Sequence, residues 1–307
     1  MKAEGAGRRI GFIGAGAVGS GLALALHRLG YEVRAVASRT AESARVLAEG
    51  IEGCQAMDSA QAAADAADLV FITTPDSAIA PVAAAVRWRE GQEVVHCCGA
   101  SGRDILRAAS EQRASTGAFH PFQTFAGIAG PEEAVERLKG VTFALSAAGS
   151  LAQFLAGVAR DLRGTAVTVT DGDRPLYHAA AILSCGYVVT LLQTALEVLQ
   201  AAGFTEEQAS QAVASLSAAT LENVDRLGVE SSVTGPLVRG DVTTVMQHMD
   251  ALAGSRPAAA GLYAHLTLLS IPLACRLGLG AEGAKSVLGK LEGLSSFQFR
   301  EDNQGTR

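Results

Sequence analysis

The first half of the chain alternates between short apolar runs and stretches in which apolar residues recur with helical spacing. LVFIT at 69–73 is continuously apolar, which is typical of a strand buried on both faces of a parallel sheet. Strands that alternate with helices indicate an α/β fold with a mostly parallel, doubly wound sheet. We predict strands at 10–13, 32–37, 69–73, 93–98, 115–119, 141–145 and 166–169, and helices at 17–29, 41–49, 60–66 and 151–162.

The pattern changes near residue 172, because from Pro175 onward only helical periodicity remains. We therefore expect an α/β domain at 1–172 and an all-helical domain at 173–307. The first helix of the second domain would be about 40 Å long at 1.5 Å per residue. Gly203 would end it, and Thr205 would cap the next helix. The expected helices are at 175–202, 206–226, 241–253, 257–277 and 281–293, and the ends at 1–7 and 295–307 are expected to be frayed.

A glycine-rich turn lies between the first strand and the first helix. Gly14, Gly16 and Gly19 form GxGxxG in the strand–turn–helix context that a dinucleotide site requires. Gly14 would allow the tight turn, Gly16 would let the backbone approach a pyrophosphate, and Gly19 would let helix and strand pack closely. Ala17 and Val18 begin the helix, whose free N–H groups and partial positive charge suit phosphate. The α/β domain is therefore predicted to bind a dinucleotide.

The second strand ends in Ser38-Arg39-Thr40, where an NAD site usually carries an acidic residue for the ribose. An arginine there can pair with a 2′-phosphate, so NADP is favoured over NAD. The alternative is that Arg39 is an ordinary solvated residue at a helix start. Thr74 and Pro75 follow the strand at 69–73, at the carboxyl edge where a ligand of such a sheet would lie.

Two histidines are candidates for proton transfer beside a nicotinamide cofactor. His120 follows the strand at 115–119 in an aromatic, proline-containing loop, where an imidazole could titrate near neutral pH. His178 lies at the start of the long helix, near the domain junction. The alternative for His120 is hydrogen bonding to loop backbone, and for His178 it is satisfying the first turn of the helix. The small loop at 98–102 is a candidate to lie under the nicotinamide ring.

Arg239 and Asp241 lie in a Gly-Pro loop between two predicted helices. Arg239 could hold a substrate carboxylate through two parallel hydrogen bonds, with Asp241 fixing the guanidinium. The alternative is that Asp241 only caps the next helix and Arg239 is a surface charge. No metal-ligand spacing is found, and no metal is expected.

Composition restricts the partners. The net charge of −6 and the pI near 5.6 give no positive footprint for nucleic acid, so we expect a small-molecule substrate. Five cysteines without CxxC spacing suit a reducing cytoplasm. The stretches 179–199 and 258–274 are apolar enough to raise a membrane question, but both carry polar residues. We expect them to lie in a helical bundle or a dimer interface rather than in a membrane.

Six motifs together resemble a known family. They are GFIGAGAVG from 11, TTPD from 73, HCCGA from 96, FHPFQTF from 119, LYHAAAILSCGY from 176 and TGPLVRGD from 234. The chain resembles the Rossmann-like NADP-binding oxidoreductases with a C-terminal helical domain of unknown function, which are similar to pyrroline-5-carboxylate reductase and to deazaflavin-linked NADP oxidoreductases. The resemblance implies an NADP-binding first domain, an all-helical second domain and a homodimer. Two departures are Cys98 in place of serine, and Cys185-Gly186-Tyr187 where members tend to read Ser-Asn-Tyr.

The leading hypothesis is an NADP-dependent oxidoreductase that acts on a C=O or C=N bond of a small, carboxylate-bearing compound. His120 or His178 would handle the proton, and Arg239 would orient the substrate. Because related dehydrogenases carry a polar side chain where this chain has Gly186, the alternative is a non-catalytic NADP-binding sensor.

Overall fold

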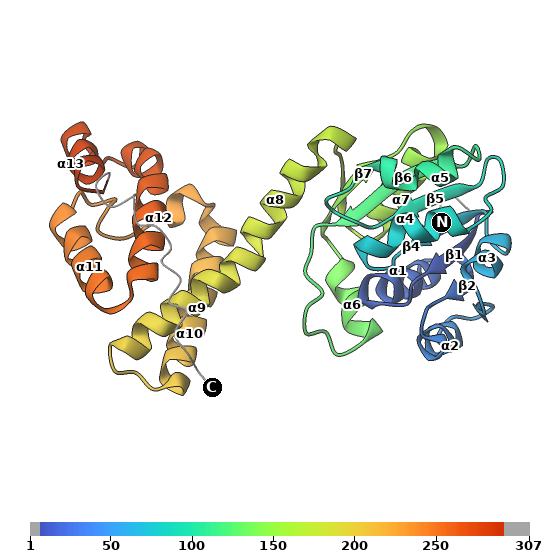
Figure 1. The fold of residues 1–307 in the computed structure, drawn as a ribbon, viewed down its shortest axis with the longest axis horizontal. Helices are drawn as coiled ribbons and strands as arrows, with labels where there is room; N and C mark the ends of the chain where they lie inside the picture. The colour runs from blue at the N-terminus through green and yellow to red at the C-terminus, as the bar shows by residue number, and fades with distance from the viewer. Residues whose placement is uncertain (1–6, 292–307) are drawn as a thin grey trace. The chain divides into compact units, whose positions relative to one another are not determined.

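The computed structural model describes residues 7–291 and divides the chain into two compact units at Gly186 (Figure 1). We describe each unit by itself. The expectations for residues 1–6 and 295–307, and for the last residues of the helix at 281–293, lie outside the described part. The boundary predicted near residue 172 follows the last strand, whereas the first unit also includes the helix at 174–184.

The first unit contains an eight-stranded sheet, within the residues described, in the order β3-β2-β1-β4-β5-β6-β7-β8. Neighbouring strands pair in parallel except β6 and β7, which are antiparallel. The strands are β1 (Arg9–Ile13), β2 (Glu32–Ala37), β3 (Gln55–Met57), β4 (Leu69–Ile72), β5 (Glu93–His96), β6 (Ser115–Pro121), β7 (Thr142–Ser146) and β8 (Thr165–Thr168). The predicted α/β class and mostly parallel sheet are confirmed.

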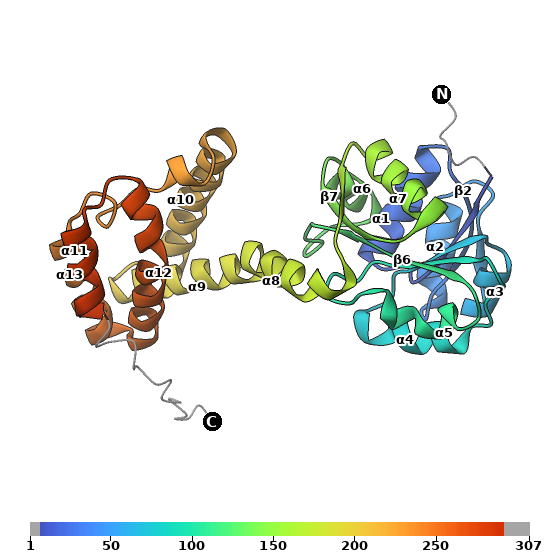
Figure 2. The ribbon, with the colours of Figure 1, turned by 90° about the horizontal axis from the view of Figure 1, so that it is seen from above.

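Helices cover both faces of this sheet (Figure 2). One face packs on α1 (Ala17–Arg28), α2 (Ala41–Glu49), α6 (Pro131–Leu138) and α7 (Gly149–Asp161). The other packs on α3 (Ala60–Asp65), α4 (Asp76–Ala85) and α5 (Arg107–Ser110). The unit ends with α8 (Arg174–Ser184).

The continuous apolar run of β4 is explained by this double coverage. Leu69 and Phe71 lie in the core of one face, and Val70 and Ile72 lie in the core of the other. All four side chains are fully buried. A strand covered on one face only would have alternated with polar residues.

Four phenylalanines form a row across one face of the sheet. The ring centroids of Phe12 and Phe71 are 5.2 Å apart, those of Phe71 and Phe119 are 6.4 Å apart, and those of Phe119 and Phe143 are 4.6 Å apart. Aromatic pairs at these separations add to the free energy gained from apolar burial. The row therefore fixes the strands whose ends carry the candidate site.

Two strands differ from the prediction. The three-residue β3 was missed because QAM carries too little apolar pattern to indicate a strand. The strand predicted at 115–119 continues to Pro121, since β7 pairs with its last residues, among them His120 with Ala144. His120 therefore lies within a strand and not in a loop.

The predicted single helix at 175–202 is wrong. Cys185 leaves the helical region, with φ −129° and ψ −76°, and separates α8 from α9 (Gly186–Ala201). No proline occurs there, so apolar periodicity alone did not reveal the break.

The other helices predicted for the second unit agree with the structure over the described residues. The helices after α9 are α10 (Glu206–Leu227), α11 (Val242–Ser255), α12 (Pro257–Arg276) and α13 (Ala281–Leu291). Thr205 caps α10 in a reciprocal arrangement with Gln208, as the prediction of a cap at Thr205 required. Gly203 has φ +96° at the end of α9, which is the conformation that favours glycine at a helix end.

The core of the second unit is formed mainly by α11, α12 and α13. By contrast, α9 has no buried residue, and α10 has only Ala209. By length and composition, Asp171–Ala201 and Pro257–Arg276 are apolar enough to cross a membrane; none of the first window is buried and 33% of the second is. Large apolar side chains are exposed on α9 and α10, namely Tyr187, Val189, Leu191, Leu216 and Leu221.

Candidate active site

The glycine bend at the end of β1 has the geometry that the sequence predicted. Gly14 has φ +114°, and a Cβ there would lie 2.6 Å from the carbonyl carbon of Thr73. A Cβ on Gly19 would overlap the Thr73 hydroxyl and the Gly14 carbonyl. Since neither position leaves room for a side chain, β1, α1 and the end of β4 pack directly on each other.

The mouth of this bend is open, which fits a bound pyrophosphate. A Cβ on Gly16 would meet nothing within 4 Å. No side chain caps α1, and its first turn has no acidic residue. The first N–H groups of a helix have no partner inside it, so Ala17 and Val18 at this start are suited to hold phosphate oxygens.

The residues after β4 lie against the same bend. The Thr73 hydroxyl donates a hydrogen bond of 2.8 Å to the Gly14 carbonyl. The Thr74 hydroxyl is buried and has no hydrogen-bond partner among the described residues. Pro75 precedes the first turn of α4. An unsatisfied buried hydroxyl at this edge fits a ligand that supplies the missing hydrogen bond.

An arginine follows the end of β2 and forms no ion pair with a described residue. Arg39 is exposed and forms no ion pair within the described chain, whereas Arg45 on α2 pairs with Glu42 and Glu49. Ser38 is half-buried, and Thr40 begins α2 without a side-chain cap. The acidic residue of the first turn of α2 is thus neutralised by Arg45, so Arg39 is suited to pair with a 2′-phosphate.

His96 fixes the loop that follows β5. Its side chain is fully buried, its Nδ1 accepts a hydrogen bond of 3.1 Å from the Cys98 N–H, and its Nε2 lies 3.1 Å from the Gly102 carbonyl. Because Nδ1 is an acceptor, Nε2 carries the hydrogen and donates it to that carbonyl. Burial, with a smaller effect of the Arg174 charge, lowers the pKa of His96 to about 4. The neutral imidazole therefore links Cys98 and Gly102, which lie at the two ends of the loop.

Gly99 belongs to the loop that His96 holds, and it lies where two imidazoles converge. A Cβ on Gly99 would be 2.7 Å from Nδ1 of His178 and 2.9 Å from Nε2 of His120. The two imidazole rings are 6.3 Å apart between centroids, at an angle of 82°. Glycine therefore leaves the space into which both histidines point. We refer to His120, Tyr177, His178 and Gly99 as the histidine junction.

Tyr177 completes the junction. Its hydroxyl lies 2.7 Å from Nδ1 of His120, and its ring packs on Phe122 at 5.4 Å between centroids. Burial raises the pKa of Tyr177 to about 12, so the phenol is protonated at neutral pH. Its O–H has no other acceptor in the described part of the chain, so we assign it as the donor to His120 Nδ1, which leaves the His120 hydrogen on Nε2.

The protonation state of His120 differs from the expectation of an imidazole that titrates near neutral pH. Burial is the main cause and the Arg174 charge is the second, and together they lower the pKa of His120 to about 4. His120 is therefore neutral at pH 7. Nδ1 of His178 is buried without a hydrogen-bond partner among the residues described. A ligand at the junction could supply one.

Sequence reasoning missed one residue of the junction and two residues that support it. Tyr177, His96 and Arg174 were not predicted as site residues, although Tyr177 precedes His178 directly in the LYH motif. The signal was the spacing of one helical turn between Arg174 and the pair at 177 and 178, because residues three or four apart share a helix face.

Arg239 and Asp241 belong to the second unit. Asp241 caps α11, since its carboxylate accepts hydrogen bonds of 3.1 Å from the Thr244 N–H and 2.6 Å from the Thr244 hydroxyl. These bonds lower the pKa of Asp241. Arg239 is exposed and forms no ion pair with a described residue. The capping role of Asp241 is thus observed, and a substrate role for either residue stays a prediction.

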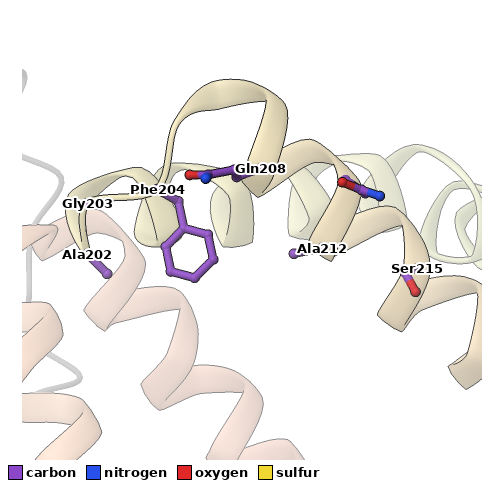
Figure 3. Close-up of a pocket in the computed structure, with 7 residues that line it drawn as sticks. Ala202, Gly203, Phe204, Gln208, Ala212 and Ser215 are labelled. Atoms are coloured by element: carbon purple, nitrogen blue, oxygen red, sulfur yellow. The ribbon is translucent and has the colours of Figure 1, made fainter.

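A shallow hollow of about 640 Å³ lies at the turn between α9 and α10 (Figure 3). Phe204, Gln208 and Ser215 line it together with small residues, and its lining has no charged side chain. It offers no chemistry comparable with that of the histidine junction.

Two family models match different parts of the sequence. Residues 9–99 match the family model described as NADP oxidoreductase, coenzyme F420-dependent, and residues 141–269 match a domain of unknown function, DUF2520. No curated protein matches the chain.

Several solved structures are similar. A Bacteroides fragilis protein provisionally described as an NADP oxidoreductase is 28% identical, with a TM-score of 0.64 over 85% of this chain and 96% of that one. A reductive aminase from Aspergillus terreus in complex with NADPH4, cyclohexanone and allyl amine is 20% identical, with a TM-score of 0.55 over 93% of each chain. A pyrroline-5-carboxylate reductase from Coxiella burnetii is 15% identical, with a TM-score of 0.56 over 94% of this chain and 98% of that one. At these low identities the last two show the fold alone. The chain therefore combines an NADP-binding oxidoreductase domain at its N-terminus with a C-terminal domain of unknown function, which confirms the resemblance read from its motifs.

Proposed function

We propose that this protein is an NADPH-dependent reductase of a C=N bond in a small, carboxylate-bearing compound, with a C=O bond as the second possibility. The observation that carries the proposal is the histidine junction, which lies on the same sheet edge as the glycine bend. A C=N bond is favoured because the reductive aminase and the pyrroline-5-carboxylate reductase, which share the fold, act on such bonds by their names.

The residues that would hold the cofactor are those of the bend and of the neighbouring strand ends. Gly14, Gly16 and the start of α1 would bind the pyrophosphate, and Arg39 would pair with the 2′-phosphate. Ser38, Thr40, Thr74 and Pro75 would contact the remaining polar groups. When bound, NADPH supplies the hydride.

The proton would come from His120. Its Nε2–H faces the space beside Gly99, where it can donate to the nitrogen of a substrate, while Nδ1 takes the proton of the Tyr177 hydroxyl. Passing a proton in this way never forms an imidazolium ion, which agrees with the low pKa of His120. Nδ1 would then return the proton to the Tyr177 oxygen while Nε2 takes one from water, which restores both groups to their starting state. His178 would accept or donate one further hydrogen bond through Nδ1.

The charge expected on the substrate follows from the charged residues near the histidine junction. Arg174 is buried close to the junction, and a positive charge favours an anionic substrate over a purely cationic iminium. A carboxylate on the substrate would satisfy this requirement. A substrate role for Arg239 stays a prediction from the sequence, and Asp241 would hold the loop of Arg239 by capping α11.

The test is NADPH consumption with a panel of cyclic imino acids, keto acids with and without an amine, and uncharged cyclic imines. We expect turnover with an imino acid and loss of at least 100-fold in kcat for His120→Ala, with NADPH affinity nearly unchanged. His178→Ala should reduce kcat as well. NADPH binding without consumption across the panel would refute the proposal and favour a nucleotide sensor.

The sensor is the second candidate, and one observation favours it. Neither His120 nor Tyr177 changes protonation near pH 7, and the junction contains no carboxylate or lysine. A protein that only reports NADP occupancy would need no proton donor. The sensor predicts a change in the oligomer or in protease sensitivity when NADPH is added, with no product.

We further propose that a second copy of the chain covers the exposed faces of α9 and α10. Val189 is 64% exposed and Leu216 is 72% exposed, and monomeric soluble proteins rarely leave such apolar patches uncovered. An identical chain is the partner always present at matching concentration. Thr194, Gln193 and Glu197 along α9 disfavour a lipid environment for this helix.

A further inference from the structure

Arg174 is fully buried, and it is the largest of the fully buried side chains among the described residues. Burying a charge without a counter-charge is unfavourable by several kcal/mol, so such a residue requires an explanation. No described carboxylate pairs with it. Asp171, whose charge acts on Arg174, is held by Arg103 through a side-chain hydrogen bond of 2.9 Å.

The guanidinium group of Arg174 binds only neutral acceptors. Nη1 donates to the Cys98 carbonyl at 3.1 Å, Nη2 donates to the Ala144 carbonyl at 3.2 Å, and Nε and Nη2 donate to the Ser146 hydroxyl at 3.1 and 3.0 Å. The Ser146 hydroxyl in turn donates to the Val169 carbonyl at 2.5 Å. Arg174 thus joins α8 to the Gly99 loop and to β7, the strand that pairs with His120.

We propose that Arg174 is the positioning residue of the histidine junction: its hydrogen bonds hold the Gly99 loop and β7 against α8, and its buried cation acts on His120 and Tyr177. The expected effect on kcat rests on the proposed function. The expected effect on the protonation of His120 does not, because it is measured in the protein without cofactor or substrate.

Several charged or titratable groups act on His120 or contact it. These groups are Arg174, Tyr177 and His178 on α8, Asp76 at the start of α4, and His96 on β5. The Arg174 cation disfavours a proton on His120 and lowers the pKa of Tyr177 against the larger effect of burial, whereas Asp76 acts in the opposite direction on His120. Arg174 therefore disfavours an imidazolium ion and favours loss of the Tyr177 proton, so Nδ1 would take that proton only as Nε2 gives its own to the substrate.

The spacing along α8 places two residues of the junction close to Arg174. Tyr177 and His178 lie three and four residues after Arg174, which places them one helical turn further along α8. Holding the Cys98 carbonyl fixes the next residue, Gly99, at the point where the two imidazoles meet. A shift of about 1 Å at such a point is enough to reduce catalysis by about 100-fold.

The decisive measurement is the NMR titration of His120 in the full chain without cofactor. The His120 resonance is identified by its loss in His120→Gln, since the chain has six histidines. We expect no protonation of His120 between pH 8 and about pH 5 in the parent, and an upward shift of its midpoint by about one pH unit in Arg174→Met. Arg174→Lys should keep the low midpoint, because it keeps the charge. Arg160→Met, which removes an exposed arginine of α7, is the matched control and should change nothing.

The hydrogen bonds are tested separately by Ser146→Ala, which retains the charge and also serves if Arg174→Met does not fold. This variant should leave the His120 midpoint unchanged and lower kcat about 10-fold, with NADPH affinity retained. A folded Arg174→Met protein with an unchanged His120 midpoint would overturn the inference, as would Ser146→Ala with full kcat. If no substrate is turned over at all, the proposed function fails while the titration still decides the electrostatic role.

Discussion

Gly99 lies against His178 so closely that a methyl group on residue 99 would be 2.7 Å from Nδ1 of that histidine. The same methyl group would be 2.9 Å from Nε2 of His120. The glycine in the HCCGA motif is thus required by two side chains from other parts of the chain, and not by a turn.

The first prediction concerns this glycine. Gly99→Ala should displace both imidazoles and lower kcat at least 10-fold, because proton transfer depends on their placement. NADPH affinity, measured by calorimetry, should change less than threefold. Gly157→Ala on α7 is the matched control, since a Cβ there meets nothing within 4 Å. Unchanged kcat in Gly99→Ala would exclude the space beside Gly99 as the reacting centre.

The second prediction concerns cofactor choice. Arg39→Ala should weaken NADPH binding by about 10- to 100-fold, which corresponds to one or two charge-assisted hydrogen bonds, and leave NADH binding nearly unchanged. Arg87→Ala, which removes another exposed arginine of the same unit, is the control. Equal losses for both nucleotides would contradict the assignment of Arg39 to the 2′-phosphate.

The third prediction concerns stability and pH. The folded pKa values of His96 and His120, both lowered to about 4, lie below the value near 6.5 of an unfolded histidine. The unfolded state therefore binds more protons between these values, so the free energy of unfolding should be highest above pH 6.5 and fall as the pH decreases toward 4. Both histidines should contribute to this fall, by roughly 3 kcal/mol for the fully buried His96 and by less for the half-buried His120. Urea denaturation at several pH values measures it.

The histidine variants separate this effect from other titrations. His120→Gln should make the fall between pH 6.5 and 4 shallower, whereas His265→Gln, at an exposed position, should leave it as it is. A parent protein whose unfolding free energy is flat over this range would show that neither imidazole is held neutral.

The fourth prediction concerns association. Val189→Glu and Leu216→Glu should convert the proposed dimer to a monomer in light scattering, because a buried unpaired carboxylate is unfavourable at an interface. Val46→Glu, at a residue of α2 that is 52% exposed, is the control and should leave the oligomeric state unchanged. A parent protein that is monomeric, or that binds lipid vesicles through α9, would contradict the second copy as the partner.

The sequence predicts the fold and the glycine bend well, and the junction less well. The bend is local: Gly14, Gly16 and Gly19 follow one another, and the strand and helix around them have clear periodicity. The junction is not local, since Arg174 contacts Cys98 across 76 residues. Periodicity identifies His120 and His178 separately, but it does not show that β7 reverses direction or that Cys185 ends α8.

The reversal of β7 has a further consequence. Since β7 runs back along the end of β6, Ser146 lies beside Ala118, which pairs with His96, and the chain that follows β8 returns to the edge where β5 ends. The residues proposed to bind the cofactor and those proposed to transfer the proton therefore come from separate segments of the chain that meet at this edge. Under the proposed function, substitutions in α8 would change the preferred substrate while the nucleotide-binding end of the fold stays the same.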